Sequence, residues 1–318
     1  MTQPIGIFDS GIGGLSVLKA LRTELPFEDF IYIADSGHAP YGERDDAHVI
    51  ARSLAMTAYL VAQNIKALVV ACNTATAAAI DVLRATYPNL PVIGVEPALK
   101  PAVAISTTKH IAVMATRSTL ASARFATLLA AQSGQAHFTL LPCDGLAEAI
   151  EQSVKDSNTI KIIAACARIL STKVTFSMQN ESEKSFDTIV LGCTHYLFAA
   201  QYIAAQVGPN VQLIDTGQAV ARQTRQRLSD VVSKQQKTPT FEFISTGNPA
   251  ALRAAPRSGV ALLAGAVEDA RPELPMPGRR PWVQPASRSA NPAGRREGDA
   301  DREDICRGCG AGPALYTD

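Results

Sequence analysis

Short apolar runs alternate with Ala- and Leu-rich segments along most of this chain, and each run ends in small or polar residues. Apolar positions between the runs recur at helical spacing, as they do from about residue 46 to residue 64. The runs that fit short buried strands are 4–8, 30–34, 68–71, 92–95, 111–114, 138–141, 189–192, 211–215 and 241–244. This alternation predicts an α/β fold with parallel sheets, whose ligands bind at the carboxyl ends of the strands.

Two of these runs end in a cysteine. Cys72 closes the run 68–71, Cys193 closes the run 189–192, and sequence of helical character follows each of them. Both sulfurs are therefore expected at strand-to-helix turns, where backbone N–H groups and the helix dipole favour thiolate over thiol. The alternative is that both are ordinary buried thiols, because free cysteine is among the most buried residue types.

The first strand runs into a glycine-rich turn, residues 9–14, before a helix predicted over 15–24. Such a turn lets a ligand approach backbone N–H groups closely. The turn lacks the Gly-Lys-Ser/Thr of a Walker A motif and the full GxGxxG pattern, so a carboxylate fits it as well as a phosphate. The simpler interpretation is a tight turn in which Asp9 caps the helix.

Composition narrows the class of partner. The chain has 318 residues, 47% of them hydrophobic, and its 30 Lys and Arg nearly balance its 29 Asp and Glu. This balance favours a small-molecule partner over nucleic acid or a membrane surface. The six cysteines are scattered, the N-terminus lacks a signal-peptide pattern, and no stretch reaches the length of an apolar membrane span. We expect a cytoplasmic protein with reduced thiols.

The character of the chain changes after about residue 253. Between residues 271 and 318, 13 of 48 residues are Pro or Gly. This composition predicts an unstructured extension over 254–318, which we hypothesise to be dispensable or an out-of-frame reading. Cys306 and Cys309 have CxxC spacing but no second ligand pair nearby, which argues against a zinc site.

Two thiols at matching positions are compatible with three chemistries. One is a thiol nucleophile with His195 as its base, and another is metal binding by Cys72, Cys193 and His195. The third is acid–base catalysis, in which one thiolate removes a proton and the opposite thiol delivers another. The third chemistry accounts best for the near-symmetry of the two cysteine motifs, since a nucleophile needs one cysteine and structural zinc usually recruits closely spaced pairs.

Four motifs taken together resemble those of glutamate racemase, in the cofactor-independent Asp/Glu racemase superfamily. They are residues 8–18, 40–42, 71–75 and 192–196, and the resemblance extends over about the first 250 residues. It implies two parallel-sheet α/β domains related by a pseudo-twofold axis, with the active site in the cleft between them. On this basis residues 1–97 plus 208–253 would form the first domain and residues 98–207 the second.

The resemblance also implies roles for individual residues. Cys72 would act on the Cα proton of D-glutamate and Cys193 on that of L-glutamate. Asp9 would assist Cys72, His195 would assist Cys193, and Glu151 would be a further acid near the histidine. Glu148 lies close to Glu151 in sequence and stays an alternative for that acid. No cofactor and no metal would be needed, and the product D-glutamate would serve peptidoglycan, hence cell-wall biogenesis and cell shape.

The positions that would hold the substrate's carboxylates and ammonium carry mainly hydroxyl, amide and backbone donors. They are Asp9, Ser10, Tyr41, Gly42, Asn73, Thr74, Thr116, Thr119, Thr194 and His195. The resemblance leaves the oligomeric state open between a monomer and a homodimer. Two other functions remain open at this point: a racemase of the same superfamily acting on aspartate or another amino acid, and a non-catalytic amino-acid-binding module.

Overall fold

The computed structural model describes residues 3–177, 186–233 and 236–254. The elements of its first half are β1 (Ile5–Asp9), α1 (Leu15–Glu24), β2 (Phe30–Ala34), the 3-10 helix η1 (Tyr41–Glu43), α2 (Asp46–Ala62), β3 (Ala67–Val70), α3 (Asn73–Thr86) and β4 (Val92–Gly94). Those of its second half are α4 (Leu99–Ile105), β5 (His110–Ala115), α5 (Arg117–Ala121), α6 (Ala123–Ala130), β6 (His137–Pro142), α7 (Leu146–Asp156), α8 (Ile160–Ser177), β7 (Thr188–Leu191), the 3-10 helix η2 (Thr194–Ala199), α9 (Ala200–Val207) and β8 (Gln212–Ile214). The elements α10 (Gly217–Arg227), β9 (Phe241–Ser245) and α11 (Ala250–Ala254) follow.

The strands form two parallel sheets, which confirms the predicted fold class. The first sheet has the order β4-β3-β1-β2-β9 and the second has the order β6-β5-β7-β8. The second order, read from its other edge as β8-β7-β5-β6, repeats the order β4-β3-β1-β2 of the first sheet. Strands β3 and β7, which precede the two cysteines, are therefore equivalent positions in a duplicated topology.

The first sheet is buried on both faces, which explains why its strands are almost continuously apolar. Side chains of a strand alternate between the two faces. Ile5 and Ile7 of β1 accordingly belong to one hydrophobic cluster, with α1, whereas Phe8 belongs to another, with α2 and α3. In β3, Leu68 and Val69 divide between the same two clusters.

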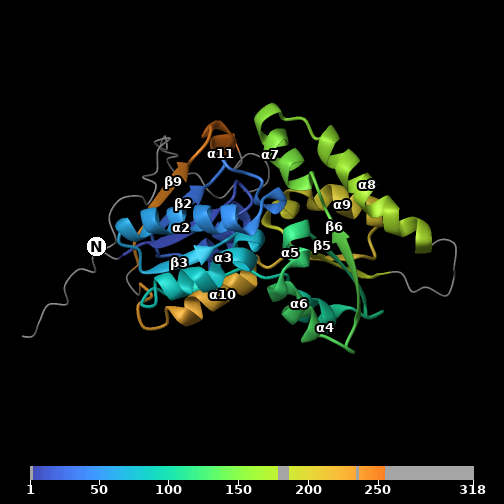
Figure 1. Cartoon of the computed structure of the whole chain (residues 1–318), viewed down its shortest axis with the longest axis horizontal. Coiled ribbons are helices and arrows are strands. Elements are labelled where there is room, and N and C mark those ends of the chain that lie inside the picture. The colour runs from blue at the N-terminus through green and yellow to red at the C-terminus, as the bar shows by residue number, and fades with distance from the viewer. Residues whose placement is uncertain (1–2, 178–185, 234–235, 255–318) are drawn as a thin grey trace, which may run out of the picture. The chain divides into compact units, whose positions relative to one another are not determined.

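The chain crosses to the second sheet between β4 and α4 and returns after β8. Helix α10 then packs against α1, and β9 pairs with β2 in parallel. In Figure 1 the orange elements α10 and β9 accordingly lie with the blue elements of the first sheet. The first sheet is therefore built from two separate parts of the chain, β1 to β4 and β9, and the second sheet from the part between them.

The predicted domain boundary at residue 208 is wrong for strand β8. That boundary assigned Gln212–Ile214 to the first domain, but β8 pairs with β7 and completes the second sheet. A strand of three residues does not carry in its own sequence the identity of its partner, which is chosen by packing of the whole chain. The predicted extension over 254–318 lies, apart from Ala254, outside the described residues and stays a prediction.

Candidate active site

Three candidate residues stand at or just after the carboxyl ends of strands, two of them in the first sheet and one in the second. Asp9 ends β1, Cys72 comes just after β3, and Cys193 comes just after β7. Cys72 is the N-cap of α3, and its sulfur accepts a hydrogen bond from the N–H of Ala75 at 3.4 Å. Cys193 precedes the 3-10 helix η2 and makes no such capping bond. Both cysteines are buried, with exposed fractions of 5% and 9%.

The surroundings of Cys72 oppose ionisation of its thiol. Burial raises the pKa of Cys72 well above its usual value, and the neighbouring carboxylate of Asp9 raises it further. Hydrogen bonds from the N–H of Ala75 and with Ser10 act in the opposite direction, the sulfur donating to Ser10 Oγ at 3.8 Å. Negative charge on Cys193 also raises the pKa of Cys72, so the two sulfurs are near enough to influence each other.

Cys193 lies beside a buried histidine–carboxylate pair. His195 Nδ1 is 3.8 Å from the Cys193 sulfur, and His195 Nε2 is 2.8 Å from Glu151 Oε1. Burial lowers the pKa of His195, but its hydrogen bonds to Cys193 and Glu151 outweigh this, and the pKa lies well above its usual value. For Glu151 burial raises the pKa, but the hydrogen bond to His195 lowers it, and the net change is a decrease. His195 therefore stands between the Cys193 sulfur and the Glu151 carboxylate, within contact of both.

The structure distinguishes the two glutamates of α7. Glu151 is buried against His195, whereas Glu148 is exposed and accepts a hydrogen bond from Gln152 at 2.9 Å. Three positions along a helix leave the two side chains about 60° apart around its axis, which is enough for Glu151 to be buried and Glu148 exposed. Of these two carboxylates, Glu151 is therefore the one that can act with His195.

The glycine-rich turn accommodates these side chains from the second half. The N–H of Ile12 donates to Glu151 Oε1 at 2.7 Å. A Cβ at Gly11 would overlap the same oxygen, and a Cβ at Gly13 would lie 2.5 Å from His195 Nδ1. Glycine at both positions is thus required by close approach. The turn was predicted as a ligand loop, and the structure shows that it also receives the pair His195 and Glu151.

Asp9 stabilises this glycine-rich turn through hydrogen bonds. Its Oδ2 accepts hydrogen bonds from the N–H of Gly14 at 2.8 Å and of Gly11 at 3.3 Å, while Thr194 Oγ1 lies 3.4 Å from Oδ1 as a donor. Burial raises the pKa of Asp9; His195 and the two amides lower it, and the net shift is upward. Gly14, and not Asp9, is the N-cap of α1, so the capping interpretation is wrong. The Asp9 carboxylate instead closes the turn before the helix and lies near the histidine and Cys72.

A cluster of hydroxyl groups joins the two halves next to Cys72. Thr74 Oγ1 lies 3.0 Å from Thr116 Oγ1 and 3.5 Å from Thr119 Oγ1, and all three residues are buried. Asn73 is buried as well, and its Nδ2 has no hydrogen-bond partner within the described part of the chain. A Cβ at Gly42 would lie 2.6 Å from Thr116 Cγ2, so η1 packs closely against Thr116. Donors of this kind suit a carboxylate ligand.

Tyr41 is engaged by a buried acid that the sequence analysis did not single out. Its hydroxyl donates to Asp35 Oδ2 at 2.5 Å, and the guanidinium of Arg52 donates to both oxygens of Asp35 at 2.8 Å. Burial raises the pKa of Asp35, but the bonds from Arg52, Thr246 and Tyr41 lower it overall. The signal was present, because residues 35–37 repeat the Asp-Ser-Gly of residues 9–11. The hydroxyl hydrogen of Tyr41 is therefore engaged by Asp35 and is not free to bind a ligand carboxylate.

Within the described residues, no three His, Cys, Asp or Glu side chains are grouped so that they could hold a metal ion. The metal-binding alternative therefore finds no ligand set in that part of the chain. The described helices include none that is long and apolar enough to cross a membrane.

Comparisons with known proteins show the family of the chain. The family model for Asp/Glu/hydantoin racemase matches residues 13–224. A glutamate racemase from Cupriavidus pinatubonensis is 45% identical, over 79% of this chain and 89% of its own length. One from Herpetosiphon aurantiacus is 44% identical, over 78% of this chain and 94% of its own.

Among solved structures, an Escherichia coli glutamate racemase in complex with L-glutamate and the activator UDP-MurNAc-ala superposes with a TM-score of 0.70. It is 28% identical, and the match covers 81% of this chain and 96% of that one. A Francisella tularensis glutamate racemase in complex with D-glutamate superposes with a TM-score of 0.69 at 25% identity, covering 86% and 98%.

The chain belongs to the Asp/Glu/hydantoin racemase family, as the motifs indicated. It is an enzyme of the amino-acid racemase class, and its similarity to the glutamate racemases extends over most of their length.

Proposed function

We propose that this protein interconverts L-glutamate and D-glutamate without a cofactor, using Cys72 and Cys193 as its two acid/base groups. The observation that supports this most strongly is the equivalence of β3 and β7 in the duplicated topology. Each of these strands is followed by a buried cysteine, and the charge on one affects the ionisation of the other. A non-catalytic binding module would have no use for this arrangement.

In the direction from L to D, the thiolate of Cys193 takes the Cα proton of L-glutamate and becomes a thiol. The electron pair stays on Cα as a carbanion, and the thiol of Cys72 delivers its proton to the opposite face, which leaves a thiolate at Cys72. In the reverse direction the two residues exchange roles. His195, with Glu151 behind it, assists at the Cys193 side, and Asp9 assists at the Cys72 side.

The substrate's charges need partners, and the site supplies donors from both halves. A Cα–H beside a carboxylate is a very weak acid, so the developing negative charge must be stabilised by preorganised donors. We assign this role to hydroxyl and amide groups of Ser10, Asn73, Thr74, Thr116, Thr119 and Thr194, with backbone groups of Tyr41 and Gly42. The unpartnered Nδ2 of the buried Asn73 is a donor ready for such a ligand.

Glutamate is the substrate class that the relatives suggest, since solved relatives hold L-glutamate and D-glutamate. Aspartate is the alternative within the family, and comparing turnover of the two amino acids decides between them. The proposal includes the cellular role implied by the resemblance: D-glutamate made in the cytoplasm for peptidoglycan, and thus for cell-wall biogenesis and cell shape. It also includes a homodimer as the assembly to look for in solution.

The experiment is incubation of the purified protein with L-glutamate in deuterated water, with no cofactor added. We expect D-glutamate to appear with deuterium at Cα, because the proton delivered comes from a thiol that exchanges with solvent. Chiral chromatography and mass spectrometry measure both quantities. Binding of glutamate without any exchange at Cα would contradict racemisation and favour the binding module.

A further inference from the structure

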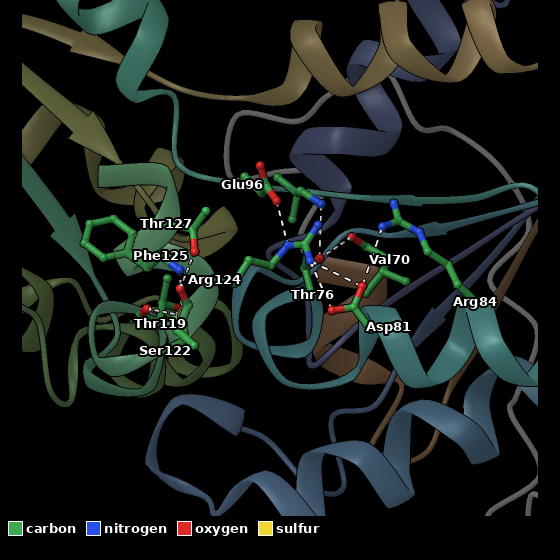
Figure 2. A network of polar contacts seen from close by, with 12 residues as sticks. Val70, Thr76, Asp81, Arg84, Glu96, Thr119, Ser122, Arg124, Phe125 and Thr127 are labelled. Carbon is green, nitrogen blue, oxygen red and sulfur yellow. Dashed lines mark hydrogen bonds and ion pairs between the residues drawn. The ribbon is translucent and has the colours of Figure 1, made fainter. Parts of the chain in front are cut away.

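Arg124 connects the second half of the molecule to the first at a distance from the cysteines (Figure 2). It lies in the first turn of α6, and its Nε donates to Glu96 Oε1 at 2.6 Å. Its Nη1 lies 3.4 Å from both carboxylate oxygens of Asp81. Glu96 belongs to the segment that links β4 to α4, and Asp81 lies on α3, the helix that Cys72 caps.

The segment that carries Arg124 meets α3 at two places. Near the start of α3, Thr74 contacts Thr116 and Thr119. About two turns further along, Asp81 faces Arg124. Ser122 joins the two contact regions, because its Oγ donates to the Thr119 carbonyl at 2.8 Å and accepts from the N–H of Phe125 at 3.1 Å. Figure 2 shows Thr119, Ser122 and Arg124 within the network of polar contacts.

The two ion pairs of Arg124 differ in strength. The side chains of Arg124 and Glu96 are 29% and 40% exposed, whereas that of Asp81 is 81% exposed. An exposed pair at longer range is weak and screened by salt, so the short bond to Glu96 is the main one. Arg84 also pairs with Asp81, at 3.8 Å, but both residues lie on α3. The Arg84 pair therefore stays within one half, whereas both Arg124 pairs cross between halves.

We infer that Arg124 is a positioning residue for the reaction: by holding α6 on Glu96 and Asp81, it keeps Thr116 and Thr119 against Thr74, beside Cys72. This inference rests on the proposed function. Arg124 acts through the fraction of enzyme whose two halves are held together for substrate binding. Lowering that fraction weakens apparent affinity in proportion and leaves the rate of the bound complex almost unchanged.

The test compares Arg124→Ala with Arg84→Ala, its matched control on the same carboxylate. We expect KM for glutamate to rise about fivefold in Arg124→Ala, with kcat changed less than about twofold, and Arg84→Ala to match the wild type. Arg124→Lys keeps the charge and should recover part of the affinity. Added sodium chloride should raise KM in the wild type and in Arg84→Ala, and should have a smaller effect in Arg124→Ala, whose bridge is already gone.

Two results overturn the inference: the same KM in Arg124→Ala and Arg84→Ala, or a fall in kcat and melting temperature with KM unchanged. If Arg124→Ala does not fold, Glu96→Gln removes the acceptor's charge at the same size and must raise KM. A wild-type protein without solvent exchange at Cα would instead refute the proposed function, so the two failures are distinguishable.

Discussion

Cys72 and Cys193 follow equivalent strands of a duplicated topology, yet their surroundings differ in charge. Cys72 caps a regular helix and has the carboxylate of Asp9 among its neighbours. Cys193 precedes a 3-10 helix and has the imidazole of His195 within 3.8 Å. A neighbouring carboxylate disfavours a thiolate, whereas a protonated imidazole favours one.

The fold therefore duplicates the position of the sulfur but not the charged groups beside it. A two-thiol racemase needs one thiolate and one thiol at the start of each turnover, since two thiols cannot remove a proton efficiently and two thiolates cannot deliver one. The raised pKa of Cys72 fits the thiol of such a pair, and His195 beside Cys193 is the group that we propose assists the other sulfur. The following predictions test this comparison, beginning with the largest expected effect.

Substitution of either cysteine should abolish racemisation. Cys72→Ser and Cys193→Ser should each lower kcat by about a thousandfold or more, because a hydroxyl is a far weaker acid than a thiol and general acid–base groups contribute factors of this size. The rates of D-glutamate formation from L-glutamate, and of the reverse reaction, measure the effect. Cys166→Ser, a change at a buried thiol of α8, is the control and should remain active. Full activity in either Cys72→Ser or Cys193→Ser would contradict the two-thiol mechanism.

Glu151→Gln should weaken the Cys193 side selectively. Removing a carboxylate 2.8 Å from Nε2 lowers the pKa of His195, so the imidazole loses its proton at lower pH. We expect kcat/KM near pH 8 to fall about tenfold, and the high-pH limb of the rate profile to move down by about one unit. The fall must be equal in both directions, because the equilibrium constant between enantiomers is one.

Glu148→Gln is the matched control for this experiment, since Glu148 is exposed on the same helix. Its pH profile should be that of the wild type. Identical pH profiles for the Glu148 and Glu151 variants would contradict a role for Glu151 in the mechanism. They would also contradict the proposal that Glu151 keeps His195 protonated.

The smallest expected effect is that of Ser10→Ala, on the Cys72 side. The Cys72 sulfur donates to Ser10 Oγ at 3.8 Å, and this bond lowers the pKa of the thiol. Its loss raises that pKa, so we expect kcat to fall only about twofold to threefold, in keeping with a long bond to sulfur. A loss as large as that of the cysteine variants would show that Ser10 itself transfers a proton.

Much of the fold could be read from the chain alone. The predicted helix over 15–24 coincides with α1, and the predicted helix over 46–64 ends two residues beyond α2. The helix α8 was not predicted, although it is the longest described one. The cysteines lie at the strand ends where they were expected, because a buried run and the turn after it are recognisable from a few consecutive residues.

The candidate site was predictable only in part. Asp9, Cys72, Cys193 and His195 belong to motifs, and the structure brings them together. The contact between the buried Asp35 and Arg52 was not predicted, because an arginine in a helix is ordinarily a surface residue. Only the folded chain places a carboxylate next to it.

Apolar periodicity, glycine-rich turns and strand-terminal cysteines are local properties, set by backbone sterics and by burial of a few neighbouring side chains, so the amino-acid order was sufficient to specify them. The partner of a group distant in sequence depends instead on how all elements pack. Tertiary structure alone decided that β8 joins β7, that Glu151 rather than Glu148 meets His195, and that Arg124 reaches Glu96. These contacts join segments far apart along the chain, and no local pattern encodes which distant group will stand opposite.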